Sequence, residues 1–415
     1  MITHAALAER FGTPLYVYDL DKVIEGRRAL FAALPEGFEL FYAFKANPHP
    51  DLARALREGD GEGGACRAEI SSTGELTAAL QAGFAAGECL YTGPGKTDAE
   101  LDDAVTRGVR LFSVESHTDL EHVGAAALRH GAGDVRALLR INSATGSATT
   151  SIRMTGRPSQ FGIDSETLPA LMPELLAVPG VRVVGAHLFT MSNAKNEDAL
   201  VEELRHAVEL AARLEREAGL PIELLDIGGG FSSPYAVPGT RARYDKLRSE
   251  LERILDLHLP RWRDGSITLA CESGRYLAGE SGSLLTGVVN IKESRGSRFV
   301  VLDAGINAVG GLSGLGRLLP AAVGVAGDGL DETGSLVGPL CTPGDLLGRD
   351  IALPALAPGD VVTVPNVGAY GVTASLLAFL GRPAPTEVAF RGDRIVSVSR
   401  IDYRRVHEPV EGTDR

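Results

Sequence analysis

Lys45 and Glu272 are the residues whose types and positions first indicate chemistry. Lys45 ends the apolar run in FYAFKANPHP, where a proline stops the strand, and Glu272 ends a second apolar run in ACESGRY. Burial lowers the pKa of a lysine and favours the neutral amine that forms an imine with a carbonyl compound. Plainer interpretations exist for both: a lysine that extends from a strand end to solvent, and a structural ion pair.

A third candidate is the triplet Gly228, Gly229 and Gly230 in LDIGGGFSSPY. Backbone N–H groups approach a phosphate closely where no side chain intervenes, so such a run can form a phosphate cradle. Alone, a glycine triplet is more typical of a tight turn. The position of the triplet among the secondary-structure elements decides between the two interpretations.

Eight apolar, β-rich runs alternate with helical patterns, as is typical of βα units around a parallel sheet. The helical stretches 97–108 and 200–219 repeat apolar residues every three or four positions. We therefore predict an α/β fold with a closed (β/α)8 TIM-like barrel, whose ligands bind at the carboxyl ends of the strands. The predicted strands are 38–47, 64–71, 88–93, 110–116, 136–142, 181–189, 224–231 and 267–274.

This barrel would bring the three candidates together. Strands one and eight are neighbours in a closed barrel, so Lys45 and Glu272 would meet at one rim. The glycine triplet follows strand seven, where barrels commonly bind phosphate. After about residue 280 the sequence changes to β-rich runs broken by Gly and Pro, which predicts a C-terminal β domain. The expected parts are an N-terminal segment 1–24 that joins the β domain, the barrel 25–279, and the β domain 280–415 with a Gly-rich mobile loop at 305–316.

Composition and charge argue against several classes of protein. The 415 residues are 44% hydrophobic, carry a net charge of -13 and contain no Lys/Arg-rich run, which disfavours a nucleic-acid partner. The start lacks a basic segment followed by an apolar one, and no apolar run reaches the roughly 20 residues that span a bilayer, so we expect a cytoplasmic protein with no membrane partner. The histidines and cysteines show no ligand spacing, so no metal site is expected.

Five motifs in order, FYAFKAN, LDIGGGF, ESGRYLAGESG, GPLCTPGDLL and GAYG, extend over nearly the whole chain. They resemble the fold type III pyridoxal phosphate (PLP) decarboxylases, the diaminopimelate and ornithine decarboxylase group. The resemblance implies an alanine racemase-like fold, PLP as the cofactor and a Schiff base at Lys45. SSTGEL (71–76), LRIN (139–142) and SQFGI (159–163) fit the same pattern as scaffold. The implied cofactor contacts are Glu272 at the pyridine nitrogen and Gly228, Gly229, Gly230, Arg275 and Tyr370 around the phosphate.

The pyridine partner discriminates between reaction types. A carboxylate at Glu272 keeps that nitrogen protonated, which makes the ring a strong electron sink when carbon dioxide departs. Racemases of this barrel family have an arginine there, so Glu272 favours decarboxylation. The resulting quinonoid must be protonated, and the resemblance implies Cys341 as the acid, reaching across a dimer interface. Outside the motif, a single cysteine would be interpreted as an inert buried thiol. Because the resemblance implies that Cys341 acts in the partner's site, we expect an isologous homodimer.

Five positions bear on the substrate and on the cofactor contacts. In GAHLFTMSN (185–193), His187 matches the first histidine of the family's sixth-strand motif and Ser192 its phosphate-contacting serine, whereas Phe189 replaces the histidine over the ring. A phenyl ring stacks but cannot change charge. Thr342 stands where diaminopimelate decarboxylases carry a glutamate for the distal amine, and Asp345 faces the substrate or caps a turn.

We therefore expect an amino-acid decarboxylase whose substrate is unusual or tethered to an acyl-carrier protein. The loss of a carboxylate at Thr342 disfavours a doubly charged diamino acid. The C-terminal motifs look closer to a branch from specialised biosynthesis that includes decarboxylases of carrier-bound aminoacyl groups. The apolar stretch 375–380 suits such a substrate or is simply a packed edge. The alternatives are diaminopimelate decarboxylase and an inactive regulatory homologue. Candidate arginines for an acidic carrier are Arg261, Arg263, Arg382, Arg404 and Arg405.

Overall fold

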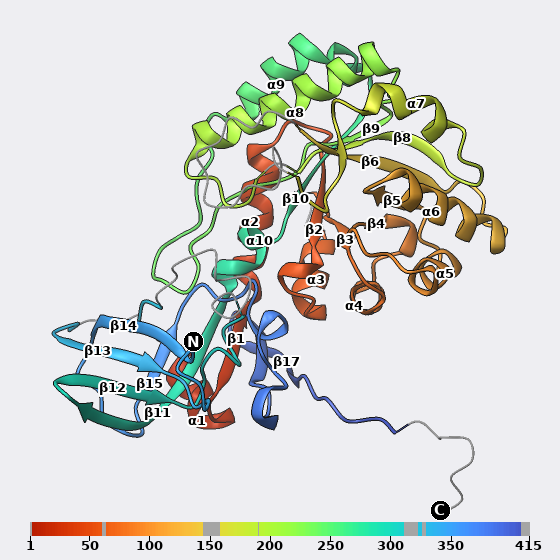
Figure 1. The fold of residues 1–415 in the computed structure, drawn as a ribbon. Coiled ribbons are helices and arrows are strands. Elements are labelled where there is room, and N and C mark those ends of the chain that lie inside the picture. Colours follow the sequence, from red (N-terminus) through yellow and green to blue (C-terminus); the bar gives the residue numbers. More distant parts are fainter. Residues whose placement is uncertain are drawn as a thin grey trace, which may run out of the picture.

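Eight parallel strands close into a barrel, as the sequence predicted (Figure 1). A computed structural model describes residues 2–59, 64–143, 158–189, 191–310, 323–325 and 329–407. Each strand pairs with its neighbours, and the first and last strands pair in parallel, so the sheet has no open edge. The barrel strands are β2 (Glu39–Ala43), β3 (Arg67–Ile70), β4 (Cys89–Tyr91), β5 (Leu111–Val114), β6 (Arg136–Asn142), β8 (Arg182–His187), β9 (Leu224–Asp226) and β10 (Thr268–Ser273).

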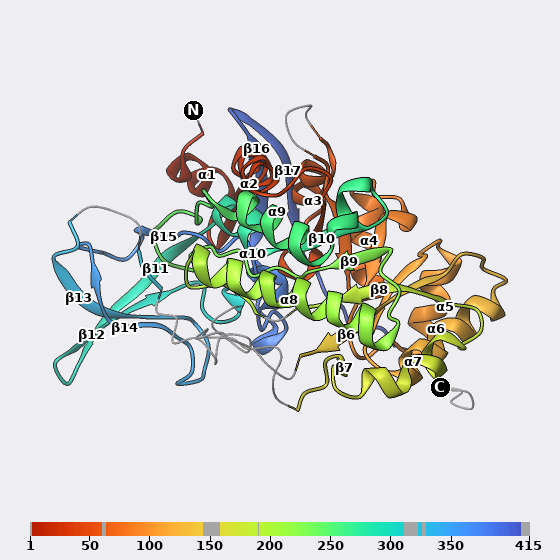
Figure 2. The ribbon, with the colours of Figure 1, turned by 90° about the horizontal axis from the view of Figure 1, so that it is seen from above.

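Helices surround this barrel, and α8 and α9 lie side by side along one flank (Figure 2). Helix α8 begins after Asn196, whose side chain accepts a hydrogen bond from the Ala199 N–H group, and ends at Gly219 with φ of 69°. The helices are α2 (Leu20–Ala33), α3 (Pro50–Arg57), α4 (Thr73–Gln81), α5 (Asp98–Thr106), α6 (His117–Arg129), α7 (Leu168–Leu176), α8 (Glu197–Ala218), α9 (Leu247–His258) and α10 (Arg275–Ala278).

The inside of the barrel is filled in layers. One buried apolar layer takes a single residue from each of seven strands: Phe41, Leu90, Leu111, Leu138, Val184, Leu224 and Ala270. Alternate residues of a strand face the same side, so the residue two positions further along each strand also points inward, nearer the carboxyl ends. On six of these strands that residue is Ala43, Thr92, Ser113, Arg140, Asp226 and Glu272. On β8, where the register with β6 shifts, His187 pairs with Arg140 and Asp226 at this level. The apolar layer therefore supports a mostly polar layer at the mouth.

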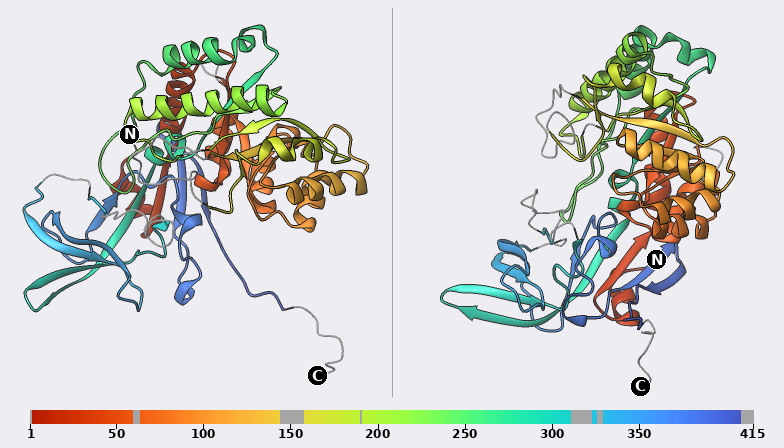
Figure 3. Two further views of the ribbon diagram at one scale, coloured as in Figure 1. Left: turned by 45° about the horizontal axis from the view of Figure 1, so that its top comes forward. Right: turned by 45° about the vertical axis from the view of Figure 1, so that its right-hand side comes forward.

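A second, mixed sheet lies beside the barrel and contains β1, from near the start of the chain, and β17, its last strand (Figure 3). β1 pairs antiparallel with β11 and parallel with β16, which places residues near the start of the chain inside this sheet. Helix α1 (His4–Phe11) precedes β1, and the two-residue strand β7 (Ile163–Asp164) extends the barrel sheet from β6. The strands of the second sheet are β1 (Leu15–Asp19), β11 (Gly282–Ser294), β12 (Ser297–Leu302), β13 (Glu332–Val337), β14 (Leu346–Leu353), β15 (Val361–Val364), β16 (Thr386–Arg391) and β17 (Arg394–Arg400).

Two hydrogen bonds join the second sheet's connections to the turn that carries Lys45. The Tyr370 N–H group donates to the Ala46 carbonyl oxygen at 2.7 Å, and the Asn47 side chain donates to the Gly368 carbonyl oxygen at 2.8 Å. Of the Gly-rich segment 305–316, residues 311–316 lie outside the described residues. In the described part of the chain, no helix is both long and apolar enough to cross a membrane.

Candidate active site

Two adjoining hollows open at the carboxyl ends of the barrel strands, and Lys45, Phe189 and Glu272 line both of them. The larger hollow, of about 300 Å³, continues past Glu69, Thr92, Lys96, Arg140 and His187. The smaller one continues past Ser192, Gly230, Arg275 and Tyr370. Lys45 and Glu272 thus meet at one rim, as the strand order required, and lie at the junction of the two hollows.

The Lys45 amine is held by carboxylates. It lies in a 3₁₀ turn (Phe44–Ala46) directly after β2, 2.9 and 2.8 Å from the two carboxylate oxygens of Glu69 and 3.9 Å from Glu272 Oε2. Burial disfavours the ammonium form, but the charges of Glu69 and Glu272 outweigh it and raise the pKa of Lys45. The expectation of a lowered lysine pKa was therefore wrong for this resting arrangement.

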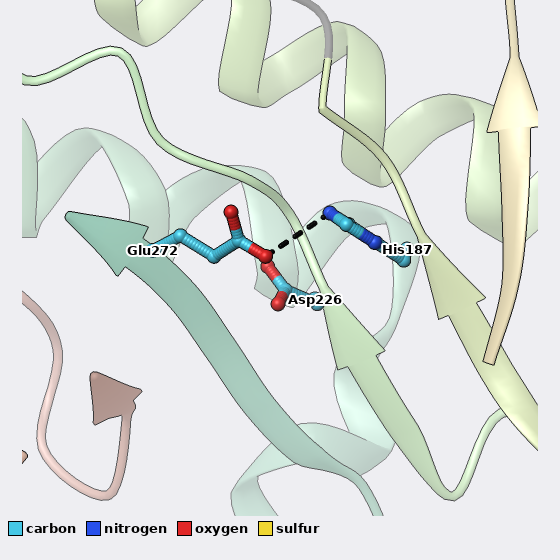
Figure 4. A group of neighbouring side chains, drawn as sticks. All are labelled: His187, Asp226 and Glu272. Atoms are coloured by element: carbon cyan, nitrogen blue, oxygen red, sulfur yellow. Dashed lines mark ion pairs between the residues drawn. The ribbon is translucent and has the colours of Figure 1, made fainter. Parts of the chain in front are cut away.

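Three buried side chains from neighbouring strands converge beneath the hollow (Figure 4). His187, Asp226 and Glu272 each offer an atom within 4.8 Å of the others, and His187 Nε2 lies 3.2 Å from Glu272 Oε1. Burial and the neighbouring charges of Glu69 and Asp226 raise the pKa of Glu272 well above its usual range. Burial, together with nearby cations, lowers the pKa of His187, so the imidazole is neutral.

The smaller hollow has the lining of an anion site. The φ angles of Gly228 and Gly230 are 78° and 104°, in the region where glycine replaces other residues at least cost. A Cβ atom on Gly229 would lie 2.3 Å from the Glu272 carbonyl oxygen, so only glycine fits there. The Arg275 guanidinium lies 4.8 Å from the centre of the Tyr370 ring, and its buried Nε has no hydrogen-bond partner among the described residues.

The Phe189 ring lies near two cationic side chains. Lys45 Nζ is 5.6 Å and the Arg140 guanidinium 5.9 Å from the centre of its ring. Arg140 also lies 4.7 Å from the Phe161 ring, and it forms an ion pair at 3.0 Å with Glu115. A neutral aromatic face can hold these cations by its quadrupole without carrying a charge of its own.

Cys341, Thr342 and Asp345 lie on the turn between β13 and β14, outside the lining of the two hollows in the same chain. Cys341 is exposed. Asp345 is buried and accepts hydrogen bonds from the Ile306 N–H group at 2.8 Å and the Leu340 N–H group at 2.7 Å. Its carboxylate therefore caps the turn, which is one of the two roles considered from the sequence.

Several residues that line the larger hollow or contact its lining were not expected from the sequence. Glu69, Asp226 and Ser113 carried no prediction, and Arg140 and Phe161 fell in segments interpreted as scaffold. The inward alternation of the strands would have found Ser113, Arg140 and Asp226, because each follows an inward apolar residue by two positions. Glu69 lies within β3, one residue before its carboxyl end.

The arginines considered for carrier binding are dispersed. Arg261 and Arg263 precede β10, at the amino ends of the barrel strands, and form ion pairs with Glu215 and Asp256. Arg382 is nearer the Cys341 turn, where its guanidinium donates to the Pro339 carbonyl oxygen at 3.3 Å. Arg261 and Arg263 therefore lie at the opposite end of the barrel from Lys45.

Comparison with known proteins gives consistent results. Residues 20–279 match the family described as pyridoxal-dependent decarboxylase, pyridoxal binding domain. The chain belongs to this family. An L-glutamyl-[BtrI acyl-carrier protein] decarboxylase of Niallia circulans is 33% identical, over 93% of this chain and 90% of that protein. A 2-[(L-alanin-3-ylcarbamoyl)methyl]-2-hydroxybutanedioate decarboxylase of Staphylococcus aureus is 28% identical, over 89% and 92%. The crystal structure of diaminopimelate decarboxylase from Helicobacter pylori complexed with L-lysine has a TM-score of 0.79 at 26% identity, covering 95% of each chain.

This decarboxylase uses pyridoxal phosphate, and its residues fit that cofactor. The two hollows share Lys45, and one has a lining suited to a phosphate while the other is large enough for a ring. Buried polar atoms without hydrogen-bond partners among the described residues lie in both places: Arg275 Nε at the smaller hollow, and Asp226 Oδ2 beneath the larger. Such atoms are costly unless a ligand supplies their partners.

Proposed function

We propose that this enzyme decarboxylates an α-amino acid whose side chain ends in an acyl linkage, such as an aminoacyl group on a carrier protein. The observation that carries the proposal is Thr342, a neutral residue where binding a distal ammonium calls for a carboxylate. The two relatives described above support it, because the name of each joins the amino acid to a larger acyl or carbamoyl group.

Bound pyridoxal phosphate supplies an electron sink for the electron pair left when carbon dioxide departs. The chain's own residues hold and tune it. Lys45 provides the attaching amine, Gly228, Gly229, Gly230, Ser192 and Arg275 hold the phosphate with Tyr370, and Phe189 offers a flat apolar face to the ring. Glu272 keeps a proton at the ring nitrogen, which a neutral partner would not do.

The proton on Lys45 must leave before its amine can act as a nucleophile. Glu69 accepts hydrogen bonds from Nζ at 2.9 and 2.8 Å and is therefore placed to receive it. Cys341 is the proposed acid that returns a proton to the substrate carbon, and its exposure on the β13–β14 turn suits a role in the site of a partner subunit. The active unit would then be a homodimer.

Carbon dioxide release by the purified, PLP-loaded protein tests the proposal. The panel holds free amino acids, including meso-diaminopimelate, and the same amino acids as aminoacyl thioesters of pantetheine and of a carrier protein. We expect release from a thioester and none from meso-diaminopimelate. Lys45→Ala should lose at least about 100-fold in rate together with the bound-cofactor absorbance, whereas Lys292→Ala, an exposed lysine on β11, should keep both.

The panel also separates the alternatives. Release from meso-diaminopimelate alone would replace the proposal with diaminopimelate decarboxylase. Cofactor absorbance without release from any substrate would favour the inactive regulatory homologue. Both alternatives keep Lys45 as the cofactor lysine, so the absorbance of Lys45→Ala tests that assignment independently of the substrate.

A further inference from the structure

A chain of buried polar groups crosses three barrel strands beneath the larger hollow. Ser113 on β5 places its Oγ 2.8 Å from Nδ1 of His187 at the end of β8, and Nε2 of the same ring lies 3.2 Å from Glu272 Oε1 on β10. All three residues are buried. The imidazole therefore connects a hydroxyl on one side with a carboxyl group on the other.

The two oxygens of Glu272 face different neighbours. Oε1 faces His187, whereas Oε2 is the oxygen closer to Lys45, at 3.9 Å from Nζ, where the hollow opens. Among the described residues, neither Oε1 nor Nε2 has a hydrogen-bond partner with ideal geometry, and each is the other's nearest ion-pair contact, at 3.2 Å. Oε2 is thus available to a cofactor, while Oε1 depends on His187.

A neutral imidazole carries one N–H group, and its partners decide on which nitrogen. When Glu272 is ionised, Oε1 can only accept, so Nε2 must donate and Ser113 must donate its hydroxyl hydrogen to Nδ1. When Glu272 is protonated, the hydrogens shift: Glu272 donates to Nε2, and Nδ1 donates to Ser113 Oγ. A hydroxyl can fill both roles because it is donor and acceptor. Ser113 and His187 can therefore hydrogen-bond Glu272 in both its ionised and its protonated form.

We propose that Ser113 and His187 are positioning residues that hold the carboxylate of Glu272 against the ring nitrogen of the cofactor, with His187 donating through Nε2. The inference rests on the proposed role of Glu272. It assigns His187 an action through Glu272 rather than on the ring itself, which Phe189 faces. Asp226 adjoins both residues, but when ionised its carboxylate has no hydrogen to donate to Glu272, and its Oδ1 accepts the Gly228 N–H group at 2.8 Å.

The charged groups around Ser113, His187 and Glu272 favour donation from His187 Nε2 to Glu272. Burial, followed by the charges of Arg140, Lys45 and Lys96, lowers the pKa of His187, so the ring remains a neutral donor instead of an imidazolium that would neutralise Glu272. Asp226 and Glu69 oppose ionisation of Glu272. A hydrogen bond to the carboxylate is therefore needed most when the cofactor takes the proton.

The test compares His187→Leu, His187→Gln and Ser113→Ala for pyridoxal phosphate affinity and for the pH midpoint of the bound cofactor's absorbance. Loss of a hydrogen bond to a charged group predicts affinity about tenfold to 100-fold weaker in His187→Leu. The pH midpoint of the absorbance should rise by about one unit. A less protonated ring nitrogen makes the nitrogen that joins Lys45 to the cofactor easier to protonate. His187→Gln keeps an N–H donor and should restore both values, and Ser113→Ala should weaken binding about threefold.

His206→Leu is the matched control, because His206 Nε2 pairs with Ser143 Oγ at 2.7 Å and does not line either hollow. It should leave affinity and midpoint unchanged. If His187→Leu and Ser113→Ala both bind pyridoxal phosphate like the wild type, the positioning role of Ser113 and His187 is overturned while the proposed function stands. A wild-type protein that binds no pyridoxal phosphate would instead overturn the proposed role of Glu272. Ser113→Ala removes only one oxygen atom, so it keeps the test open if His187→Leu does not fold.

Discussion

Asp226 and Glu272 lie together in the barrel interior, where two buried carboxylates cannot both ionise without a cation between them. Burial raises the pKa of Asp226 to about 7, against the lowering effect of the Gly228 N–H hydrogen bond. A bound ring nitrogen that shares the Glu272 proton would relieve this conflict. In the protein without cofactor, ionising these buried carboxylates lowers the free energy of unfolding, by an amount that depends on pH.

Asp226→Asn measures that cost. The folded-state pKa lies above the unfolded value of 3.8, so the folded wild type binds a proton more tightly and loses stability as pH rises through about 7. Asparagine removes this loss and still accepts the Gly228 N–H group. We expect the gain in free energy of unfolding from Asp226→Asn to be larger at pH 8 than at pH 5.5, in urea titrations of the cofactor-free protein.

The exposed Asp256 provides the control for this comparison. Its hydrogen bond with Arg263 lowers its pKa, so Asp256 stays ionised from pH 5.5 to 8 and Asp256→Asn should have the same effect at both values. An Asp226→Asn gain of equal size at the two pH values would show that Asp226 is already ionised in the folded protein, and would contradict the argument.

The sequence identified Lys45 and Glu272 because each ends an apolar run, a local signal. The pKa of Lys45 was misjudged for a physical reason: its dominant partner, Glu69, comes from the next strand, and such pairing is not visible in a local pattern. Asp226 and Arg140 could have been found by counting two positions beyond each inward apolar residue. Asp226 carried no prediction and Arg140 fell in a segment interpreted as scaffold, because the inward-facing residues of the barrel were not assigned one by one.

At the scale of elements, β8 and β9 approach each other closely at Gly185. A Cβ atom on Gly185 would lie 1.6 Å from the Leu224 carbonyl oxygen, which belongs to the neighbouring strand and cannot move without opening the barrel. Gly185→Ala should therefore lower the free energy of unfolding by about 3 kcal/mol or more, measured by urea denaturation. Because β8 carries His187 and β9 carries Asp226, cofactor affinity should fall as well.

Gly87→Ala is the matched control, since a Cβ atom there meets nothing within 4 Å. Its stability should stay within about 0.5 kcal/mol of the wild type. If Gly185→Ala were equally harmless, β8 and β9 would have to be further apart than described.

All eight barrel strands and the helices at 97–108 and 200–219 were predictable, because their periodicity is a property of the chain itself. The strand predicted for 38–47 ends earlier, at Ala43, and the following turn carries Lys45. This turn is fixed by distant groups: Tyr370 donates to Ala46, and Asn47 donates to Gly368. Contacts between segments more than 300 positions apart leave no mark on the local sequence pattern.

At the scale of the whole molecule, the site is built from both sheets, yet the predicted site residues Cys341, Thr342 and Asp345 lie outside it. Tyr370 comes from the second sheet's connections and lines the smaller hollow. Cys341 is exposed on a turn whose shape is fixed by the buried Asp345 carboxylate. A rigid turn that presents an exposed thiol away from its own lysine suits donation to another subunit, as the proposed homodimer requires.

Mixing two inactive variants tests this arrangement. Lys45→Ala and Cys341→Ala each remove one residue from every site of their own homodimer. If Cys341 acts in the partner's site, a mixed dimer has one site with both residues and one with neither. Random exchange makes half of the dimers mixed, so about a quarter of all sites, and of wild-type activity, should return. If Cys341 acts within its own subunit, every site of the mixture lacks one residue and no activity returns. Mixing under conditions that prevent subunit exchange gives the baseline, because restored activity must then be absent in either case.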